Sequence, residues 1–318
     1  MGSFIRCTFR KCAIFLTLIT IVSTIIHQLS YLELNDVTDT IKLLDKCNAK
    51  GATQLDDYHT IMSRSIPDTI HQIWKITDTT TYSSQASNTF WQDNFGPLNY
   101  TVTLWTDQEI QHLIESEYTW LLSTYKGYTQ DIQRADLGRL VVVHAKGGIY
   151  ADLDVFPRNP TAIDCLRRSG TQAIFSPTSS NSGFSNHFFM AEKGSMFLYE
   201  TLRTAKQRGG SHHRRILLPY LQVFWSTGPI MVTAAFRQYW ILRDAPRDEV
   251  ALLDHEFTKR MVGHAAGRSW HSADGVFLNE FADHIKLIET WVIWSVATIT
   301  LGIVVVKTCR LLKRGFPL

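Results

Sequence analysis

Residues 131–155 read DIQRADLGRLVVVHAKGGIYADLDV, and two hydrophobic periods follow one another within them. The first has apolar positions at intervals of three and four residues, as on one face of a helix: Leu137, Leu140, Val141 and His144. The Gly147-Gly148 pair then gives a typical helix end, because glycine readily adopts the backbone conformation required there. After it, Ile149–Val155 alternates as a strand does. The stretch therefore predicts a helix, a glycine turn and a strand.

Two more strands are expected before this stretch. The first lies within residues 66–75, whose isoleucines and tryptophan indicate burial, and the second is Thr101–Trp105, which is β-branched and aromatic. A helix should follow the second strand, because Thr106 and Glu109 form a capping pattern. Strands and helices in alternation predict an α/β fold with a mostly parallel sheet, whose ligands bind at the carboxyl ends of the strands.

Four charged residues of residues 131–155 are candidates for chemistry. Asp152 and Asp154 are two apart, so in an extended strand both carboxylates point to one face and suit Mg²⁺ or Mn²⁺. The alternative is an ordinary strand end with two solvated acids. Asp136 and Arg139 lie one helical turn apart and can face the same cleft. Their alternative is an ion pair on the helix surface.

The charge of the chain is distributed unevenly. It has 318 residues, 45% of them hydrophobic, with 32 basic and 29 acidic side chains, which excludes a disordered chain; its 18 glycines and 5 cysteines exclude a collagen-like or disulfide-scaffold chain. Residues 1–32 and 290–318 carry seven basic residues and no acid, so residues 33–289 carry 25 basic against 29 acidic residues. Basic ends around an acidic body indicate a membrane protein and not a nucleic-acid-binding one.

Two apolar runs predict membrane-spanning helices. The uncharged run at 12–32 is long enough for an uncleaved signal anchor, with a cleaved signal peptide as the alternative. The run at 290–306 has two tryptophans near its start, and its alternative is a buried core helix. The positive-inside rule places both basic ends in the cytosol and the body in the lumen of the secretory pathway. The expected divisions are a cytosolic tip at 1–11, the anchor at 12–32, a stem at 33–65, a catalytic domain at 66–287, the second helix at 290–306 and a cytosolic tail at 307–318.

Two smaller features agree with a lumenal body. Cys47 and Cys165 are its only thiols, so they can form one disulfide in an oxidising compartment. The Asn99-Tyr100-Thr101 sequence is a glycosylation sequon, a short pattern that also occurs by chance.

The run from Arg134 to Asp154 resembles the donor-site motif of glycosyltransferase family 32, the D-x-D mannosyltransferases with a GT-A fold. The resemblance covers roughly residues 64–306, and within the family it is greatest to the fungal inositol phosphorylceramide mannosyltransferase catalytic subunits. Further blocks match in order, at residues 70–75, 104–107, 185–190, 226–229 and 267–274. The resemblance implies a GT-A (Rossmann-like) domain flanked by membrane helices.

The resemblance also implies the roles of individual residues. Asp152, Asp154 and His271 would hold Mn²⁺ or Mg²⁺ against the diphosphate of GDP-mannose. Asp136 would accept hydrogen bonds from sugar hydroxyls, and Arg139 would contact the sugar or the diphosphate. The other donor-binding residues would be His71, Trp74, Arg134, Tyr150 and Trp270. The family retains anomeric configuration, and attack on the front face of the sugar is expected because no second pair of close carboxylates is evident.

The expected acceptor is a lipid headgroup, inositol phosphorylceramide in sphingolipid biosynthesis. Only 15 residues separate Asp274 from Thr290, which keeps the cleft close to the bilayer. His212–Arg215 could contact the phosphate of such a lipid or form a solvated basic loop. Some members of the family have a further acid at the position where this chain has Val155–Pro157. This difference leaves the identity of the acceptor open. The alternatives are a mannosyltransferase for protein-linked glycans, a glycosyltransferase for another lipid-like molecule, and a catalytically silent scaffold.

The expected location is the Golgi membrane, as a multi-pass protein. The resemblance implies a small membrane-bound regulatory subunit as a partner, and nucleic acid is not an expected partner.

Overall fold

The computed structural model divides the chain into two compact units, Met1–Leu32 with His271–Leu318, and Glu33–Trp270. The second unit, called the sheet unit below, contains all of the described strands. The structure describes residues 2–32, 42–44, 47, 66–82, 85–178, 183–210, 213–243 and 249–265.

The first unit contains helix α1, Gly2–Leu29, and the short 3-10 helix Ser30–Leu32. Within the described residues, no helix combines the length and apolar character needed to cross a membrane. The spanning helix at 12–32 therefore stays a prediction, and the one at 290–306 lies outside the described residues.

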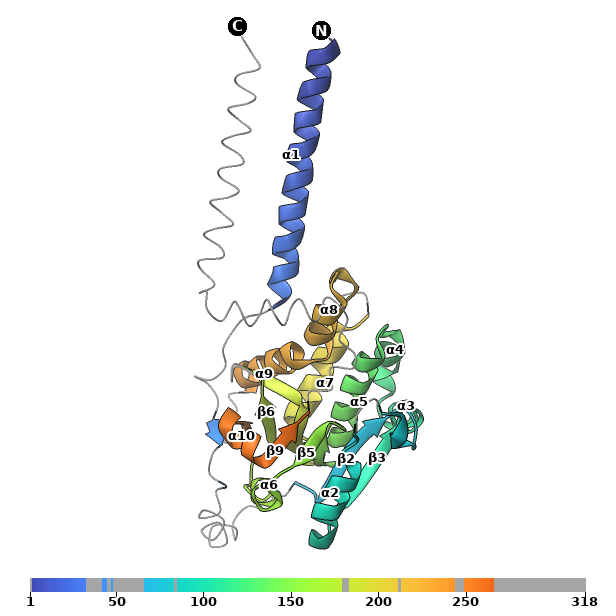
Figure 1. The fold of residues 1–318 in the computed structure, drawn as a ribbon, viewed down its shortest axis with the longest axis vertical. Coiled ribbons are helices and arrows are strands. Elements are labelled where there is room, and N and C mark those ends of the chain that lie inside the picture. The colour runs from blue at the N-terminus through green and yellow to red at the C-terminus, as the bar shows by residue number, and fades with distance from the viewer. Residues whose placement is uncertain are drawn as a thin grey trace. The chain divides into compact units, whose positions relative to one another are not determined.

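A mixed sheet runs through the sheet unit (Figure 1). In the described part of the chain its order is β1-β8-β6-β7-β4-β2-β3. All neighbours pair in parallel except β7, which is antiparallel to both β4 and β6. The expected mostly parallel sheet is confirmed, with one strand reversed beside β4. The strands are β1 Lys42–Leu44, β2 Thr69–Trp74, β3 Thr101–Thr106, β4 Gly148–Ala151, β6 Ala173–Pro177, β7 Phe184–Ala191 and β8 Val250–Leu253.

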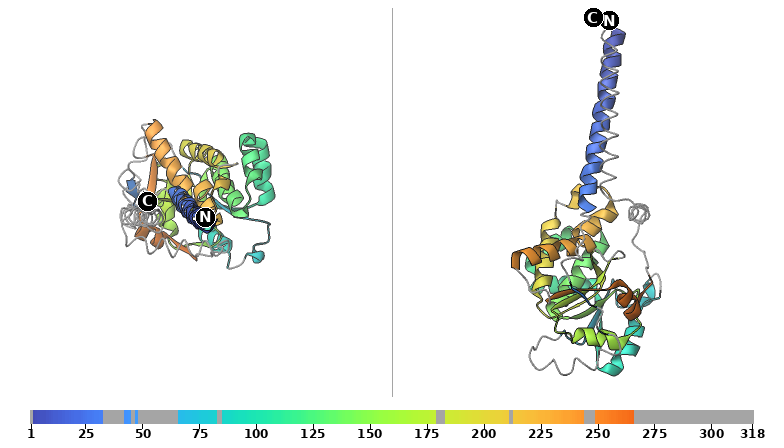
Figure 2. Two further views of the ribbon diagram at one scale, coloured as in Figure 1. Left: turned by 90° about the horizontal axis from the view of Figure 1, so that it is seen from above. Right: turned by 90° about the vertical axis from the view of Figure 1, so that its left-hand side faces the viewer.

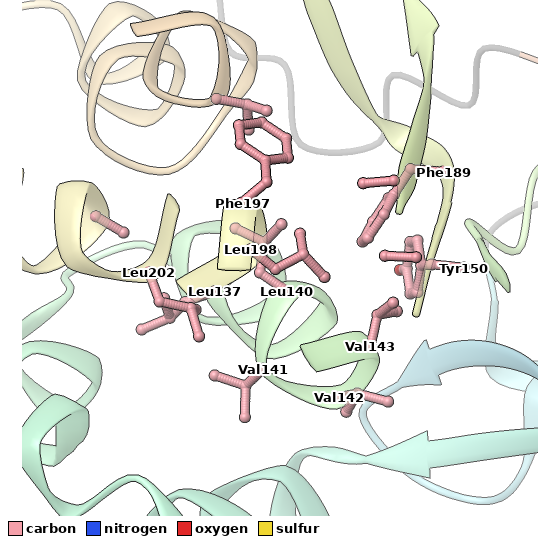
Figure 3. Close-up of a cluster of buried hydrophobic side chains, with 14 of the residues drawn as sticks. Leu137, Leu140, Val141, Val142, Val143, Tyr150, Phe189, Phe197, Leu198 and Leu202 are labelled. Atoms are coloured by element: carbon pink, nitrogen blue, oxygen red, sulfur yellow. The ribbon is translucent and has the colours of Figure 1, made fainter. Parts of the chain in front are cut away.

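Helices cover both faces of this sheet (Figure 2). Side chains alternate along β4, so Tyr150 packs with one group of helices and Ile149 with the other. Figure 3 shows the first group's core, where α5 and α7 meet Tyr150 and Phe189. The first group comprises α3 Asp107–Glu117, α4 Thr119–Gly127, α5 Asp131–Lys146, α7 Met196–Arg208 and α9 Pro229–Arg243, and α8 Pro219–Ser226 adjoins it. The second comprises α2 Asn88–Phe95, α6 Pro160–Arg167 and α10 His255–Met261.

The glycine turn between α5 and β4 forms as predicted. Gly147 ends α5 with φ of 70°, and Gly148 begins β4 with φ of 111°. A Cβ atom on Gly148 would lie 2.4 Å from the Thr69 carbonyl oxygen. Glycine therefore lets α5 end and β4 start directly against β2. The predicted capping box at the start of α3 is also confirmed, between Thr106 and Glu109.

The strand predicted for Ile149–Val155 is too long. β4 ends at Ala151, and Asp152–Asp154 form a turn in which the Val155 amide donates to the Asp152 carbonyl at 2.9 Å. The chain resumes as β5, Val155–Pro157, which pairs with β9, Val262–His264, in a separate two-stranded sheet. The two acids therefore lie in a turn and not in a strand.

Cys47 and Cys165 form the disulfide that their position in the sequence allowed. Their Cα atoms are 5.8 Å apart, and both residues are buried beside the second group of helices. The bond ties the segment before β2 to α6.

Candidate active site

The turn Asp152–Asp154 lies at the carboxyl end of β4, next to the carboxyl end of its parallel neighbour β2, which in turn pairs in parallel with β3. Its backbone makes hydrogen bonds to three other segments of the chain. The Asp152 amide donates to the carbonyl of His187 at 2.9 Å, and the Leu153 and Asp154 carbonyls accept from the amides of Ser87 and Ala265 at 2.8 Å. The turn is therefore fixed by segments that are remote from it in the sequence.

Arg139 on α5 is the central cation of the site. Its guanidinium lies 3.3 Å from carboxylate oxygens of both Asp136 and Asp152, and it donates to the Asn186 carbonyl at 3.1 Å. It also lies over the ring of Tyr150, 5.0 Å from the ring centroid. Burial acts to lower the pKa of Arg139, but the surrounding carboxylates raise it above its ordinary value. Arg139 is therefore a buried, permanently charged group.

Asp136 faces the same cluster, as the helical spacing predicted. Asn186 Nδ2 and Thr227 Oγ1 donate to its two carboxylate oxygens at 3.1 and 2.9 Å. Burial raises the pKa of Asp136, while Arg139 and these two donors oppose the rise. Asp136 thus connects α5 to β7 and to the residue after α8.

Asp152 is half-buried, with its side chain 25% exposed. The Tyr150 hydroxyl donates to it at 2.7 Å. Burial raises the pKa of Asp152 to about 6; Arg139 opposes the rise and the nearby charge of Asp154 adds to it. Two carboxylates on one turn therefore repel each other, and a cation bound between them would relieve that repulsion.

Two histidines that the sequence reasoning assigned no role lie beside Asp154. His264 Nε2 is 3.4 Å from Asp154 Oδ2, and the His264 ring stacks on that of His187 at 4.5 Å between centroids. Burial acts to lower the pKa of His264, but Asp154 raises it above the ordinary value. Burial lowers the pKa of His187 to about 3. His187 lies in the matching block at 185–190, whereas no local signal marks His264.

His71, predicted to bind the donor, is buried under the glycine turn. Its Nε2 bonds to the Gly147 carbonyl at 2.8 Å, and its Nδ1 accepts from Trp105 Nε1 at 3.1 Å. Burial lowers the pKa of His71 to about 4, so the ring is neutral. Because both nitrogens bond to the protein, His71 can influence a donor only by positioning these neighbours.

Trp74 and Arg134 lie on elements beside the turn. Trp74, at the carboxyl end of β2, donates from Nε1 to Thr81 Oγ1 at 2.7 Å. Arg134 donates to the Tyr128 carbonyl at 2.8 Å and pairs with Asp131. Trp270 and His271 lie outside the described residues. Arg134 also lines a cavity of about 510 Å³ together with Asp107, Gln108, Gln111, His112, Glu115 and Tyr125.

The residues at the turn fit a hard divalent cation. Asp152 and Asp154 supply carboxylate oxygens, the donors that Mg²⁺ and Mn²⁺ prefer. Among the described residues, no group of three acidic, histidine or cysteine side chains is arranged to hold a metal ion. The third expected ligand, His271, is not among the residues described.

One donor atom of the cluster has no partner among the described residues. Arg139 Nε is buried and has no hydrogen-bond partner in the described part of the chain. A buried donor without an acceptor is unfavourable, so an anionic or hydroxylated ligand that reached this atom would satisfy it.

Residues 67–172, which include the Asp152–Asp154 turn, match the family described as "Glycosyltransferase sugar-binding region containing DXD motif". The chain is 30% identical over 258 residues to inositol phosphoceramide mannosyltransferase 3 of Schizosaccharomyces pombe, covering 79% of this chain and 67% of that protein. It is 29% identical to inositol phosphoceramide mannosyltransferase 1 of the same organism, covering 66% of this chain and 63% of the relative. Mannosyl phosphorylinositol ceramide synthase CSH1 of Saccharomyces cerevisiae is also 29% identical, with 59% and 49% covered. The chain thus spans about half to two thirds of these relatives' lengths.

Among solved structures, the PaToxG glycosyltransferase is similar to the chain at 17% identity, with 60% of this chain and 78% of that one covered and a TM-score of 0.41. The identity and coverage of the sequence relatives, together with the matched D-x-D region, establish the family. The chain belongs to the glycosyltransferases whose sugar-binding region contains a DXD motif.

Proposed function

We propose that the chain is a retaining mannosyltransferase with a GT-A fold, which transfers mannose from GDP-mannose to inositol phosphorylceramide. The observation that carries this proposal is the buried cluster in which Arg139 contacts both Asp136 and Asp152 at the carboxyl end of β4. The names of the fungal relatives support the sugar and the acceptor.

The cluster is suited to a sugar diphosphate. Asp152 and Asp154, with His271 expected as a third ligand, would hold Mn²⁺ or Mg²⁺, which when bound stabilises negative charge on the departing diphosphate. Arg139 adds a fixed positive charge in a water-poor site, where it acts strongly on developing negative charge. Its Nε is buried and has no partner among the described residues, so a phosphate or sugar oxygen that reached this atom would satisfy it. Asp136 can still accept a hydroxyl bond, because a carboxylate has about four acceptor positions.

The cavity beside β3 suits the nucleoside. β3 and β4 are separated only by β2, so their ends lie about 10 Å apart. Asp107 and Arg134 line the cavity, and partial desolvation raises the pKa of Asp107. A carboxylate can accept two neighbouring N–H groups from guanine, which uracil does not offer. This chemistry supports a guanosine donor.

The transfer step then needs no enzyme nucleophile. The acceptor oxygen bonds to the anomeric carbon on the face from which the phosphate leaves, the bond from carbon to phosphate oxygen breaks, and the acceptor proton passes to that oxygen. Asp136 is a poor nucleophile for a double displacement, because Asn186 and Thr227 already bond to its two oxygens.

The membrane setting belongs to the same proposal. We expect spanning helices at 12–32 and 290–306, the sheet unit in the Golgi lumen and a small membrane-bound regulatory subunit as partner. The disulfide between Cys47 and Cys165 supports an oxidising compartment.

The test is transfer of labelled mannose by membranes that contain the full chain. Wild type should label inositol phosphorylceramide, and unlabelled GDP should compete more strongly than UDP. Asp152→Asn and Asp154→Asn should each lower transfer by about a hundredfold or more, whereas the exposed Glu117→Gln should not. If the label appears on protein-linked glycans or on another lipid, inositol phosphorylceramide is not the acceptor. Full activity of both aspartate variants would refute the proposed metal site.

A further inference from the structure

One segment of the sheet unit has a charge opposite to that of the rest. Residues 201–243 contain no acid and seven basic residues: Arg203, Lys206, Arg208, Arg214, Arg215, Arg237 and Arg243. The other residues of the sheet unit, 33–200 and 244–270, carry 17 basic against 25 acidic side chains. A segment this basic on an otherwise acidic body indicates an anionic partner.

The start of α8 combines these charges with exposed apolar surface. Leu217, between the 3-10 helix His213–Arg215 and α8, is 66% exposed, and Arg214 and Arg215 are exposed beside it. At the other end of α8, the guanidinium of Arg208 lies over the ring of the half-buried Trp225, 4.6 Å from its centroid. An exposed leucine, a tryptophan and arginines together are typical of a protein surface that lies in the headgroup region of a bilayer.

This surface adjoins the candidate active site. The residue after α8 is Thr227, which donates to Asp136, and Ser226 accepts from Gln133 of α5 at 2.7 Å. α8 has eight residues and is therefore about 12 Å long. Leu217 is thus about one short helix away from Thr227, the residue that bonds to Asp136.

The placement within the sheet unit is one-sided. α8 and the turn before it lie at one end of this unit, and α2 and α6 lie at the other (Figures 1 and 2). The exposed Leu98, which directly follows α2, belongs to the far end. The exposed Lys193 follows β7, whose last residue Ala191 pairs with Gly148 at the edge of the sheet away from the aspartate turn.

We propose that residues Arg208, Arg214, Arg215, Leu217 and Trp225, called the α8 surface, dock the sheet unit onto a bilayer that contains anionic lipid. Basic residues near an anionic leaflet strengthen association on the order of fivefold each, and salt weakens the effect. The proposal goes beyond the proposed function, because it depends on neither the donor nor the acceptor.

The test is hydrogen–deuterium exchange of the full chain in nanodiscs. Discs of phosphatidylcholine alone are compared with discs that also contain phosphatidylinositol, and no nucleotide sugar is added. We expect amides of residues 214–225 to exchange several-fold more slowly on the anionic discs, and 0.5 M salt to remove the difference. Equal exchange on both discs would overturn the proposal. This result is also expected if the surface binds another protein instead of a bilayer.

The variants separate charge from apolar contact. Arg214→Glu with Arg215→Glu should abolish the lipid-dependent protection, and Leu217→Ser should reduce it. The matched controls Lys193→Glu and Leu98→Ser should keep it. If the α8 variants misfold, the salt series on the wild-type protein still tests the proposal. Protection from exchange that does not depend on salt or on lipid charge would contradict it. Protection without mannose transfer would leave this proposal intact and count against the proposed function alone.

Discussion

Arg139 is the residue on which the charge balance of the site depends. It is the buried cation beside the buried Asp136 and the half-buried Asp152. Arg139→Ala should lower the free energy of unfolding by about 3–5 kcal/mol, because it leaves buried carboxylates without a counter-charge. Chemical denaturation measures this. Lys126→Ala, which breaks an exposed pair with Glu115, should cost less than about 1 kcal/mol. Equal losses in the two variants would contradict the role of Arg139.

His71 gives the protein a pH dependence of stability. Its pKa is about 4 in the folded protein against an ordinary 6.5. As pH falls from about 6.5 to 4, the unfolded chain binds a proton that the folded protein does not, so stability decreases across this window and the loss is complete below it. The loss is at most about 3 kcal/mol. Denaturation of wild type and His71→Gln at several pH values measures it, and equal pH slopes in the two proteins would exclude His71 as a source.

At the scale of the element, Gly148 controls how α5 joins β4. Gly148→Ala should lower the free energy of unfolding by about 3 kcal/mol or more, because φ is 111° and the new Cβ would lie 2.4 Å from the Thr69 carbonyl. Gly194→Ala is the matched control, since Gly194 has φ of 70° but open space around it, and it should cost about 1–2 kcal/mol. The difference between the two variants in denaturation isolates the close approach to β2. Equal costs would show that the backbone conformation alone matters.

Elements governed by local signals were predictable. α5, the glycine turn and the capping box of α3 each follow from residues within one or two turns of each other. The end of β4 was not predictable, because the alternation of apolar and polar residues continues through Leu153 and Val155. The strand stops at Ala151 because the turn bonds to Ser87, His187 and Ala265, which no local pattern connects to it.

The same distinction applies to the site. Asp136 and Arg139 were predictable from one helical turn, and the structure brings both to Asp152. His264 was not, because it reaches Asp154 only through the pairing of β9 with β5. Asn186 lay in a recognised block, but its contact with Asp136 depends on β7 running antiparallel to β4.

At the scale of the whole sheet unit, acidic and basic residues lie in separate regions next to the Asp152–Asp154 turn. The parallel strands β2, β3 and β4 bring the aspartate turn and the cavity lined by Asp107 to one edge. The acid-free residues 201–243 reach this edge through Thr227. The net charge of the chain conceals this division between an acidic site and a basic neighbouring surface.

Metal binding should stabilise the whole unit. A cation that binds only the folded protein adds about 2.7 kcal/mol to stability at a hundred times its Kd. Mn²⁺ should therefore raise the Tm of wild type by about 5 °C or more, and EDTA should reverse the shift. Asp152→Asn with Asp154→Asn should lose the shift, because it removes both carboxylates, whereas Glu117→Gln should retain it. Differential scanning fluorimetry without any nucleotide measures this, so the result is independent of activity. An equal Mn²⁺ shift in the double variant would place the cation elsewhere in the protein.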